Sequence, residues 1–269
     1  MEKQEKKEWV QKNKSKWIAL GVGLTLLVLG IVLTVVTRAG ALAENAGDGS
    51  KIPFALGLIM ILLGVVIPLV GMLPEKKKTD VRTLAMAALF AALCYIGFSY
   101  CKIDIPVGME KTAFHLGNVF CVLAALFLGG LWGGMAGAVG MTIADLTTAY
   151  VTSAPKTFLL KLCIGLITGF VAHKIFKISR DKEDRKIPLT AATVISCAAG
   201  MGFNIVADPV VGYFYKMYVL GVPQQAASIW AKIGAVTTSV NAVVAVIAAS
   251  VLYMALRKAM KRTNLMPKL

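Results

Sequence analysis

Thirty-three residues without a charged side chain separate Lys111 from Asp145. A helix needs about 20 apolar residues to cross the hydrocarbon core of a bilayer. This stretch is therefore too long for one crossing and long enough for two. Glycine is concentrated at its centre, in residues 129–134 (GGLWGG), and glycine permits the backbone conformations that a tight reversal needs. We predict a helical hairpin that turns within these residues.

Further apolar runs surround this hairpin, and the whole chain is 57% hydrophobic and 16% charged, with a mean hydropathy of +0.72. Soluble domains carry about 25% charged residues, so the composition excludes that class. We predict an all-α integral membrane protein with about eight transmembrane helices. Their runs are residues 17–37, 52–73, 84–101, 113–130, 131–150, 157–176, 187–214 and 226–256. The first run is longer than the apolar part of most signal peptides and follows a lysine-rich leader, so we expect an uncleaved anchor.

The Lys and Arg side chains are unevenly distributed along the chain. Twenty-one lie in residues 1–16, 74–82, 174–186 and 257–269, and only six lie in the segments that alternate with these. With eight crossings the four basic segments share one side of the membrane, which the positive-inside rule makes cytoplasmic. We therefore predict a plasma-membrane protein with both termini in the cytoplasm. The net charge of +15 follows from this topology, and we expect no nucleic-acid partner.

Four charged side chains remain inside the apolar runs, namely Asp145, Lys161, Asp208 and Lys232. A charge at the centre of a transmembrane helix costs about 2.5–3.5 kcal/mol on insertion scales, so such residues face a protein interior or a water-filled cavity. Counted from the predicted helix ends, all four lie in the outer half of the membrane. We predict a polar binding chamber that faces the exterior. The alternative is that they form structural ion pairs between helices, or that the two lysines extend to the interface.

Other polar side chains are predicted at the same depth. His115 and Asn118 lie within two turns of an outer helix end, and Tyr150 lies where the helical hairpin leaves the membrane. Asn204 precedes Asp208 by four residues, so both project from one helix face. We include these residues in the candidate binding site, together with Asn241, which lies deeper in the last helix. The segment 102–112, with Pro106 and Gly108, is expected to be an outer loop that acts as a lid.

Motifs for catalysis, phosphate binding and metal binding are absent from the sequence. There is no GxxxxGK[ST], HExxH or GxSxG motif. The five cysteines lie in or beside apolar runs without metal-binding spacing. We expect no enzymatic activity, catalytic residue, metal or cofactor. Energy for uphill transport would come from an ion gradient or from a partner.

The segments FHLGNVF, LAALFLGGLWGGMAGAVGMTIADL and APKTFLLKLCIGLITGFVAH resemble the substrate-binding (S) components of energy-coupling factor (ECF) vitamin transporters. The similarity is to the branch of riboflavin, pyridoxine and hydroxymethylpyrimidine carriers and covers about residues 79–261. It is weaker after Lys186, where NIVADPVVGYFY and Asn241 occupy positions at which the family tends to carry an acidic residue and an asparagine.

This resemblance implies a six-helix substrate-binding bundle in residues 79–269, with a vitamin-like ligand near the outer surface. It also implies a membrane-embedded coupling protein and two cytoplasmic ATPases as partners. In the family an AxxxA face on the first helix of the bundle meets the coupling protein. Ala88 and Ala92 match that spacing, and Ala87 with Ala91 is an equally possible register. Residues 1–78, a basic leader and a two-helix hairpin, are additional to this pattern, and they either dock a partner or anchor the chain.

Three other functions compete with vitamin capture. The first is a self-sufficient ion-coupled transporter in which Asp145 and Asp208 carry protons. The second is an intramembrane enzyme, which is disfavoured because no nucleophile–base pairing is visible. The third is an assembly factor for membrane proteins that binds no ligand. The small residues at Gly130/Gly134 and Gly133/Gly137 are expected to serve internal helix packing.

Overall fold

The structure of the chain is a computed structural model that describes residues 18–26, 28–30, 32–33, 36, 60, 80–108, 110–179 and 187–263. The chain divides into two compact units, Met1–Glu75 and Lys76–Leu269. In the first unit, residues 18–26 and 28–30 are helical, within the first predicted crossing. The basic leader, nearly all of the second predicted crossing and the linker before residue 80 lie outside the described residues.

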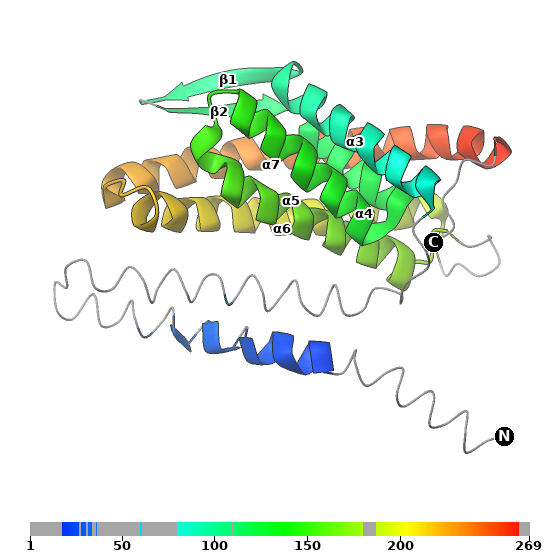
Figure 1. The fold of residues 1–269 in the computed structure, drawn as a ribbon, viewed down its shortest axis with the longest axis horizontal. Coiled ribbons are helices and arrows are strands. Elements are labelled where there is room, and N and C mark those ends of the chain that lie inside the picture. The colour runs from blue at the N-terminus through cyan, green and yellow to red at the C-terminus, as the bar shows by residue number, and fades with distance from the viewer. Residues whose placement is uncertain are drawn as a thin grey trace. The chain divides into compact units, whose positions relative to one another are not determined.

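The described residues of the second unit form five long helices, two strands and two short helical turns (Figure 1). In chain order these are α3 (Val81–Ser99), β1 (Lys102–Val107), β2 (Glu110–His115), α4 (Gly117–Thr147), η2 (Val151–Ser153), α5 (Ala154–Phe170), η3 (Val171–Ile175), α6 (Leu189–Tyr218) and α7 (Gln224–Arg262). The helix α4 packs against α3, α5 and α7, and α6 packs against α5 and α7. The core therefore forms around α4.

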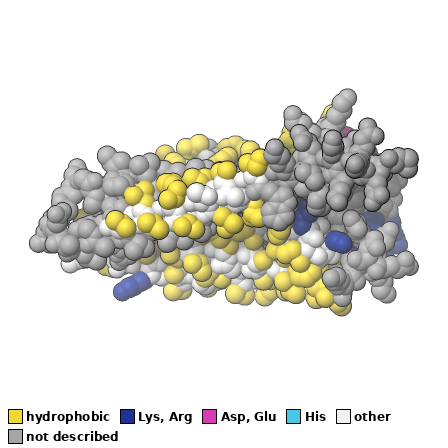
Figure 2. Space-filling view, turned by 90° about the horizontal axis from the view of Figure 1, so that it is seen from below, with side chains coloured by type: hydrophobic (Ala, Val, Ile, Leu, Met, Phe, Trp, Pro, Cys, Tyr) yellow, Lys and Arg dark blue, Asp and Glu magenta, His cyan; other side chains and the backbone are white. Residues whose placement is uncertain are grey.

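Five helices of this unit are long and apolar enough to cross a membrane, by length and composition. In Figure 2 hydrophobic side chains make up much of the described surface that is visible, and the Lys and Arg side chains in view lie away from its middle. Large apolar side chains such as Leu89, Val206 and Val251 are more than half exposed, which suits a lipid-facing surface. The predicted class, an all-α membrane protein, is confirmed.

The glycine-rich centre of α4 makes the predicted reversal. Gly129 has φ 81° and ψ 175°, outside the helical region, and a residue with a side chain would rarely adopt this φ. Residues eight apart in a straight helix are separated by about 12 Å. Yet a Cβ added at Gly133 would overlap the backbone of Ala125, and one at Gly137 would overlap Cys121. The two legs of α4 are therefore antiparallel and in close contact, with the turn at Gly129.

Glycine also permits the close approach of α4 and α5. A Cβ on Gly165 would overlap the backbone of Gly134, and one on Gly169 would overlap the backbone of Gly130. Small residues four apart on both helices thus pack against each other, as expected for helices that associate in lipid. The expected internal packing role of Gly130/Gly134 and Gly133/Gly137 is confirmed.

A β-hairpin replaces part of what the sequence analysis expected to be loop and helix. The strands β1 and β2 are antiparallel, with Lys102 opposite His115 and Val107 opposite Glu110. The helix predicted to begin at residue 113 therefore begins at Gly117, and the segment predicted as a loop is mostly strand. The error has a physical cause, since β-branched and aromatic residues at Ile103, Ile105 and Phe114 suit a strand as well as an apolar helix.

Candidate functional site

A cavity of about 150 Å³ lies between the β-hairpin and the ends of α3 to α7 that adjoin it. Every one of these helices contributes to its wall, and β2 closes one side. The polar and aromatic residues that line it include Phe98, His115, Asn118, Asp145, Tyr150, Lys156, Thr157, Lys161, Asn204, Asp208, Tyr213, Lys216, Trp230, Thr238 and Asn241. Polar side chains from α4, α5, α6 and α7 therefore meet around one cavity.

Eight of the nine candidate binding residues line this cavity, namely His115, Asn118, Asp145, Tyr150, Lys161, Asn204, Asp208 and Asn241. Asn204 and Asp208 both face it, in agreement with the predicted shared face of their helix. The ninth candidate, Lys232, is exposed and does not line the cavity. Its position near the start of α7 lets its ammonium group reach solvent, which is the alternative that was considered for it.

Asp208 is held by two neighbouring helices. The Lys156 Nζ atom on α5 lies 2.8 Å from Asp208 Oδ1, and the Thr238 hydroxyl on α7 donates to Asp208 Oδ2 at 2.8 Å. Both carboxylate oxygens are thus occupied by partners from within the protein. For Asp208 this arrangement is the structural ion pair that the sequence analysis considered as the alternative to ligand binding.

Lys161 and Asp145 are in a different situation. Lys161 is only 7% exposed and Asp145 only 2%. Among the described residues, no acidic oxygen lies within 4.0 Å of Lys161 Nζ, and no donor lies within hydrogen-bonding distance of Asp145 Oδ2. Buried polar groups are normally hydrogen-bonded, so these two side chains have bonding capacity that the described part of the protein leaves unused.

Neutral side chains of the same wall share this property. Asn118 Oδ1, Asn204 Oδ1 and His115 Nδ1 are buried and find no hydrogen-bond partner among the described residues. Each belongs to a residue that lines the cavity. A concentration of unused donors and acceptors around one cavity is the arrangement expected of a binding site whose ligand supplies the missing bonds.

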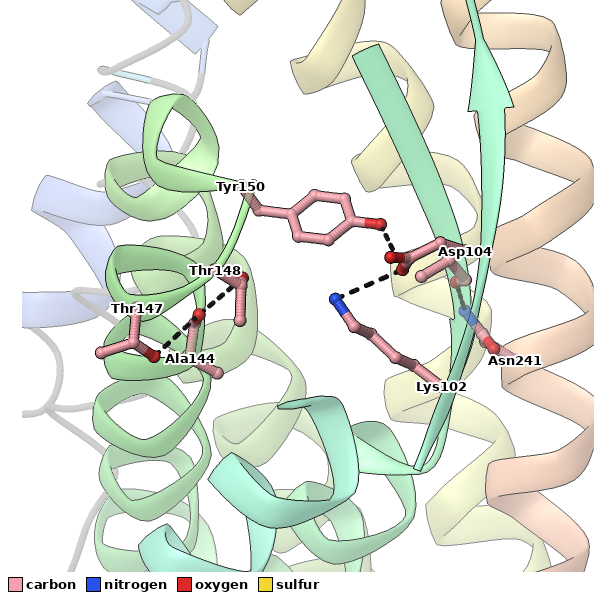
Figure 3. A network of polar contacts seen from close by, with 8 residues as sticks. Lys102, Asp104, Ala144, Thr147, Thr148, Tyr150 and Asn241 are labelled. Carbon is pink, nitrogen blue, oxygen red and sulfur yellow. Dashed lines mark hydrogen bonds and ion pairs between the residues drawn. The ribbon is translucent and has the colours of Figure 1, made fainter. Parts of the chain in front are cut away.

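A polar network links the β-hairpin to the end of α4 (Figure 3). The Tyr150 hydroxyl donates to Asp104 Oδ1 at 2.9 Å, and Lys102 Nζ lies 3.3 Å from the same oxygen. Lys102 also lies over the Tyr150 ring, 4.8 Å from its centroid. The Phe98 ring packs edge-on against both Tyr150 and His115, with centroids 5.4 Å and 4.6 Å away. These contacts fasten the hairpin beside the cavity.

The surroundings of His115 and Tyr150 determine whether each side chain carries its proton near pH 7. Burial lowers the pKa of His115 to about 3, and the positive charges of Lys161 and Lys102 act in the same direction while Asp208 opposes them. His115 is therefore neutral near pH 7. Burial, together with the adjacent Asp104 carboxylate, raises the pKa of Tyr150, so its hydroxyl keeps its proton and remains a donor.

Several lining residues were missed by the sequence analysis. Lys156 was counted among the lysines of outer loops, but α5 begins at Ala154 and carries Lys156 in its first turn. The signal was Pro155, because proline is favoured in the first turn of a helix. Thr238 gave no comparable signal, since threonine occurs throughout apolar helices.

The two alanine registers of α3, Ala87/Ala91 and Ala88/Ala92, differ in how exposed their residues are. Ala88 and Ala92 are exposed, whereas Ala87 is buried. The carbonyl of Ala91 faces Gly140 so closely that a Cβ on that glycine would overlap it. Ala87 and the backbone of Ala91 therefore pack inside the bundle, whereas Ala88 and Ala92 are exposed.

Long apolar helices around a cavity with buried charges define the class of membrane-embedded proteins with an internal polar cavity. No group of three or more His, Cys, Asp or Glu residues suited to a metal ion occurs in the part of the chain that the structure describes. A family model described as "ECF-type riboflavin transporter, S component" matches residues 78–258. The match covers more than half of the chain, and the chain belongs to this family. No curated protein and no solved structure matches the chain.

Proposed function

We propose that the chain is the substrate-capture subunit of an ECF-type importer and binds a vitamin or vitamin precursor in the cavity at the hairpin end of the bundle. Membership of the S component family supports a substrate-binding role. The observation that carries the proposal is the set of buried, unpartnered polar atoms of Asp145, Asn118, Asn204 and His115 around one cavity. A protein without a ligand gains nothing from burying these atoms.

The cavity is lined by four lysines, Lys111, Lys156, Lys161 and Lys216, and by two aspartates, Asp145 and Asp208, of which Lys161 and Asp145 are buried. Lys156 and Asp208 neutralise each other, and deeper in the wall Lys161 contributes one positive charge and Asp145 one negative charge. A ligand that accepts a hydrogen bond from Lys161 and donates one to Asp145 would satisfy both. Riboflavin, which the family description names, carries donors and acceptors, so it is the first compound to test.

The size of the cavity adds a requirement. Pockets for drug-sized ligands usually measure about 300–1,000 Å³, whereas this one measures about 150 Å³. A ligand as large as riboflavin would need the cavity to widen. The β-hairpin is the wall that can move, because it rests on side-chain contacts such as the one between Tyr150 and Asp104. We propose that it acts as a lid.

Delivery across the membrane requires partners in this proposal. The sequence has no GxxxxGK[ST] motif, so we propose that a membrane-embedded coupling protein and two cytoplasmic ATPases supply the energy. The exposed pair Ala88 and Ala92 would give the coupling protein a surface for close helix packing. The protein would lie in the plasma membrane with both termini cytoplasmic, and residues 1–78 would form a separate hairpin domain.

The alternative is an ion-coupled transporter in which Asp145 and Asp208 carry protons. The contacts of Asp208 disfavour it, since Lys156 and Thr238 stabilise the charged carboxylate. Accumulation of substrate by the reconstituted chain alone, under a proton or sodium gradient, would favour this alternative and contradict the capture subunit.

Equilibrium binding to the purified protein tests the proposal. We expect riboflavin, or another vitamin or precursor from a panel that can accept a hydrogen bond from Lys161 and donate one to Asp145, to bind. Mass spectrometry of small molecules that co-purify with the protein provides an independent identification. Failure of every compound in the panel to bind, with no co-purifying solute, would contradict the capture function.

A double variant tests the partner surface. Replacing Ala88 and Ala92 with Leu adds bulk where a close helix approach is proposed. We expect the variant to fold and bind ligand like the wild type but to lose uptake in cells that supply the partners. Ala198→Leu, at an exposed alanine of α6, is the matched control and should retain uptake. Equal uptake by all three proteins would exclude this surface.

A further inference from the structure

Asn241 on α7 binds the backbone of strand β2 with both ends of its amide. Its Oδ1 atom accepts from the His115 backbone N–H at 3.0 Å, and its Nδ2 atom donates to the Ala113 carbonyl at 3.0 Å. The donor and acceptor on the strand fix which amide atom faces which group. The side chain of Asn241 is buried, at 6% exposure. Two of its hydrogen-bonding positions are therefore committed to the hairpin.

The spacing of these contacts is that of a strand partner. Alternate residues of a strand direct their backbone N–H and C=O groups to the same edge. Ala113 and His115 are alternate residues, and β1 pairs along the opposite edge of β2. Asn241 thus satisfies the free edge of β2 in the way that a third strand would, and it covers backbone groups that would be costly to leave unbonded in an apolar bundle.

A second contact of α7 lies about one helical turn from Asn241. Thr238 precedes Asn241 by three residues, so the two share a helix face, and the Thr238 hydroxyl donates to Asp208. Asp208 in turn pairs with Lys156 on α5. One face of α7 therefore holds the hairpin at Asn241 and the ion pair between α5 and α6 at Thr238, on two sides of the same cavity.

We propose that Asn241 is a positioning residue that fastens strand β2 and His115 to α7 and thereby sets how long the ligand stays in the cavity. This inference rests on the proposed capture function and replaces the expectation that Asn241 contacts the ligand. Ligand escapes when the hairpin moves outward, and the two amide hydrogen bonds must break for β2 to leave α7. Loss of these bonds speeds ligand dissociation and leaves association almost unchanged.

Hydrogen exchange at the His115 amide tests the clamp without any ligand. The variants are Asn241→Ala and Asn241→Leu, of which the second keeps the volume of the side chain. The control is Ser239→Ala, because among the described residues the Ser239 hydroxyl donates to the Ala235 carbonyl of its own helix, at 2.7 Å. A net hydrogen bond changes an equilibrium by roughly threefold to tenfold. We expect exchange at His115 to quicken about tenfold to hundredfold in both Asn241 variants and not in the control.

Dissociation of riboflavin, measured by stopped-flow fluorescence on the same proteins in nanodiscs, supplies the functional readout. We expect the dissociation rate to rise about tenfold in the Asn241 variants, with little change in the association rate. Weaker binding with unchanged exchange at His115 would show that Asn241 contacts the ligand, and unchanged exchange alone overturns the clamp. If the wild type does not bind riboflavin, the choice of ligand fails, but the exchange measurement still decides the role of Asn241.

Discussion

Replacement of Lys161 by Met separates the ligand-binding role of this lysine from a structural one. Met keeps most of the length and the apolar stem of Lys161 and removes its charge. The ammonium group is buried, and none of the described acidic groups lies within ion-pairing distance of it. The folded protein without ligand therefore bears the cost of burying this charge and has little direct compensation for it.

The expected effects on stability and on binding have opposite signs. An unpaired buried charge carries a desolvation cost that an apolar side chain does not, so Lys161→Met should leave the free energy of unfolding unchanged or raise it. A hydrogen bond to a charged group contributes about 1.5–3 kcal/mol. Loss of one such bond to the ligand predicts a Kd that is roughly 10-fold to 150-fold higher.

Two measurements on the same preparations check this prediction. Equilibrium binding gives the Kd, and thermal unfolding in detergent without ligand gives the stability. Lys232→Met is the matched control, because Lys232 is exposed and lies outside the cavity wall, and it should change neither quantity. An unchanged Kd together with a lower Tm in Lys161→Met would refute the argument and identify Lys161 as a structural cation.

Three further predictions concern the hairpin and the helix packing. Burial lowers the pKa of His115 from 6.5 to about 3, so its neutral form stabilises the fold above pH 6.5. This stability is lost as the pH falls from 6.5 toward 3. His115→Gln should therefore flatten that part of the curve of stability against pH. Tyr150→Phe removes the hydrogen bond to Asp104 and should speed hydrogen exchange in the hairpin, whereas saturating ligand should slow exchange there in the wild type. Gly133→Ala would place a methyl group against the backbone of Ala125, and we expect a loss of more than 2 kcal/mol of stability from overpacking, seen as a lower Tm.

The sequence predicts the membrane class and the turn of α4 well because both depend on local composition. Apolar runs of membrane-crossing length have few alternatives, and a glycine cluster in the middle of 33 uncharged residues marks the place where a backbone can reverse. The partners of Gly134 and Gly169, by contrast, depend on which helices meet. The spacing of small residues predicts close packing without naming the partner helix.

The β-hairpin shows a limit of periodicity. Residues 113–115 continue an apolar run that becomes helical only at Gly117. What decides their conformation is remote in the sequence, since Asn241 binds their backbone from 126 or more residues away. A side chain that satisfies a strand edge looks, in the sequence, like any polar residue in a helix.

For the four intramembrane charges, the sequence predicts their depth in the membrane but not their ion-pair partners. Their distances from predicted helix ends place them at one level, and three of them line the cavity. Pairing requires a knowledge of rotation about each helix axis, and here the sequence misleads, because the partner of Asp208 is Lys156, a lysine that was assigned to a loop. Once Lys156 neutralises Asp208, Lys161 is left without an acidic partner within 4.0 Å and the Asp145 Oδ2 atom without a hydrogen-bond donor among the described residues. That remainder, rather than the number of charges, is what supports the proposed binding site at this end of the bundle.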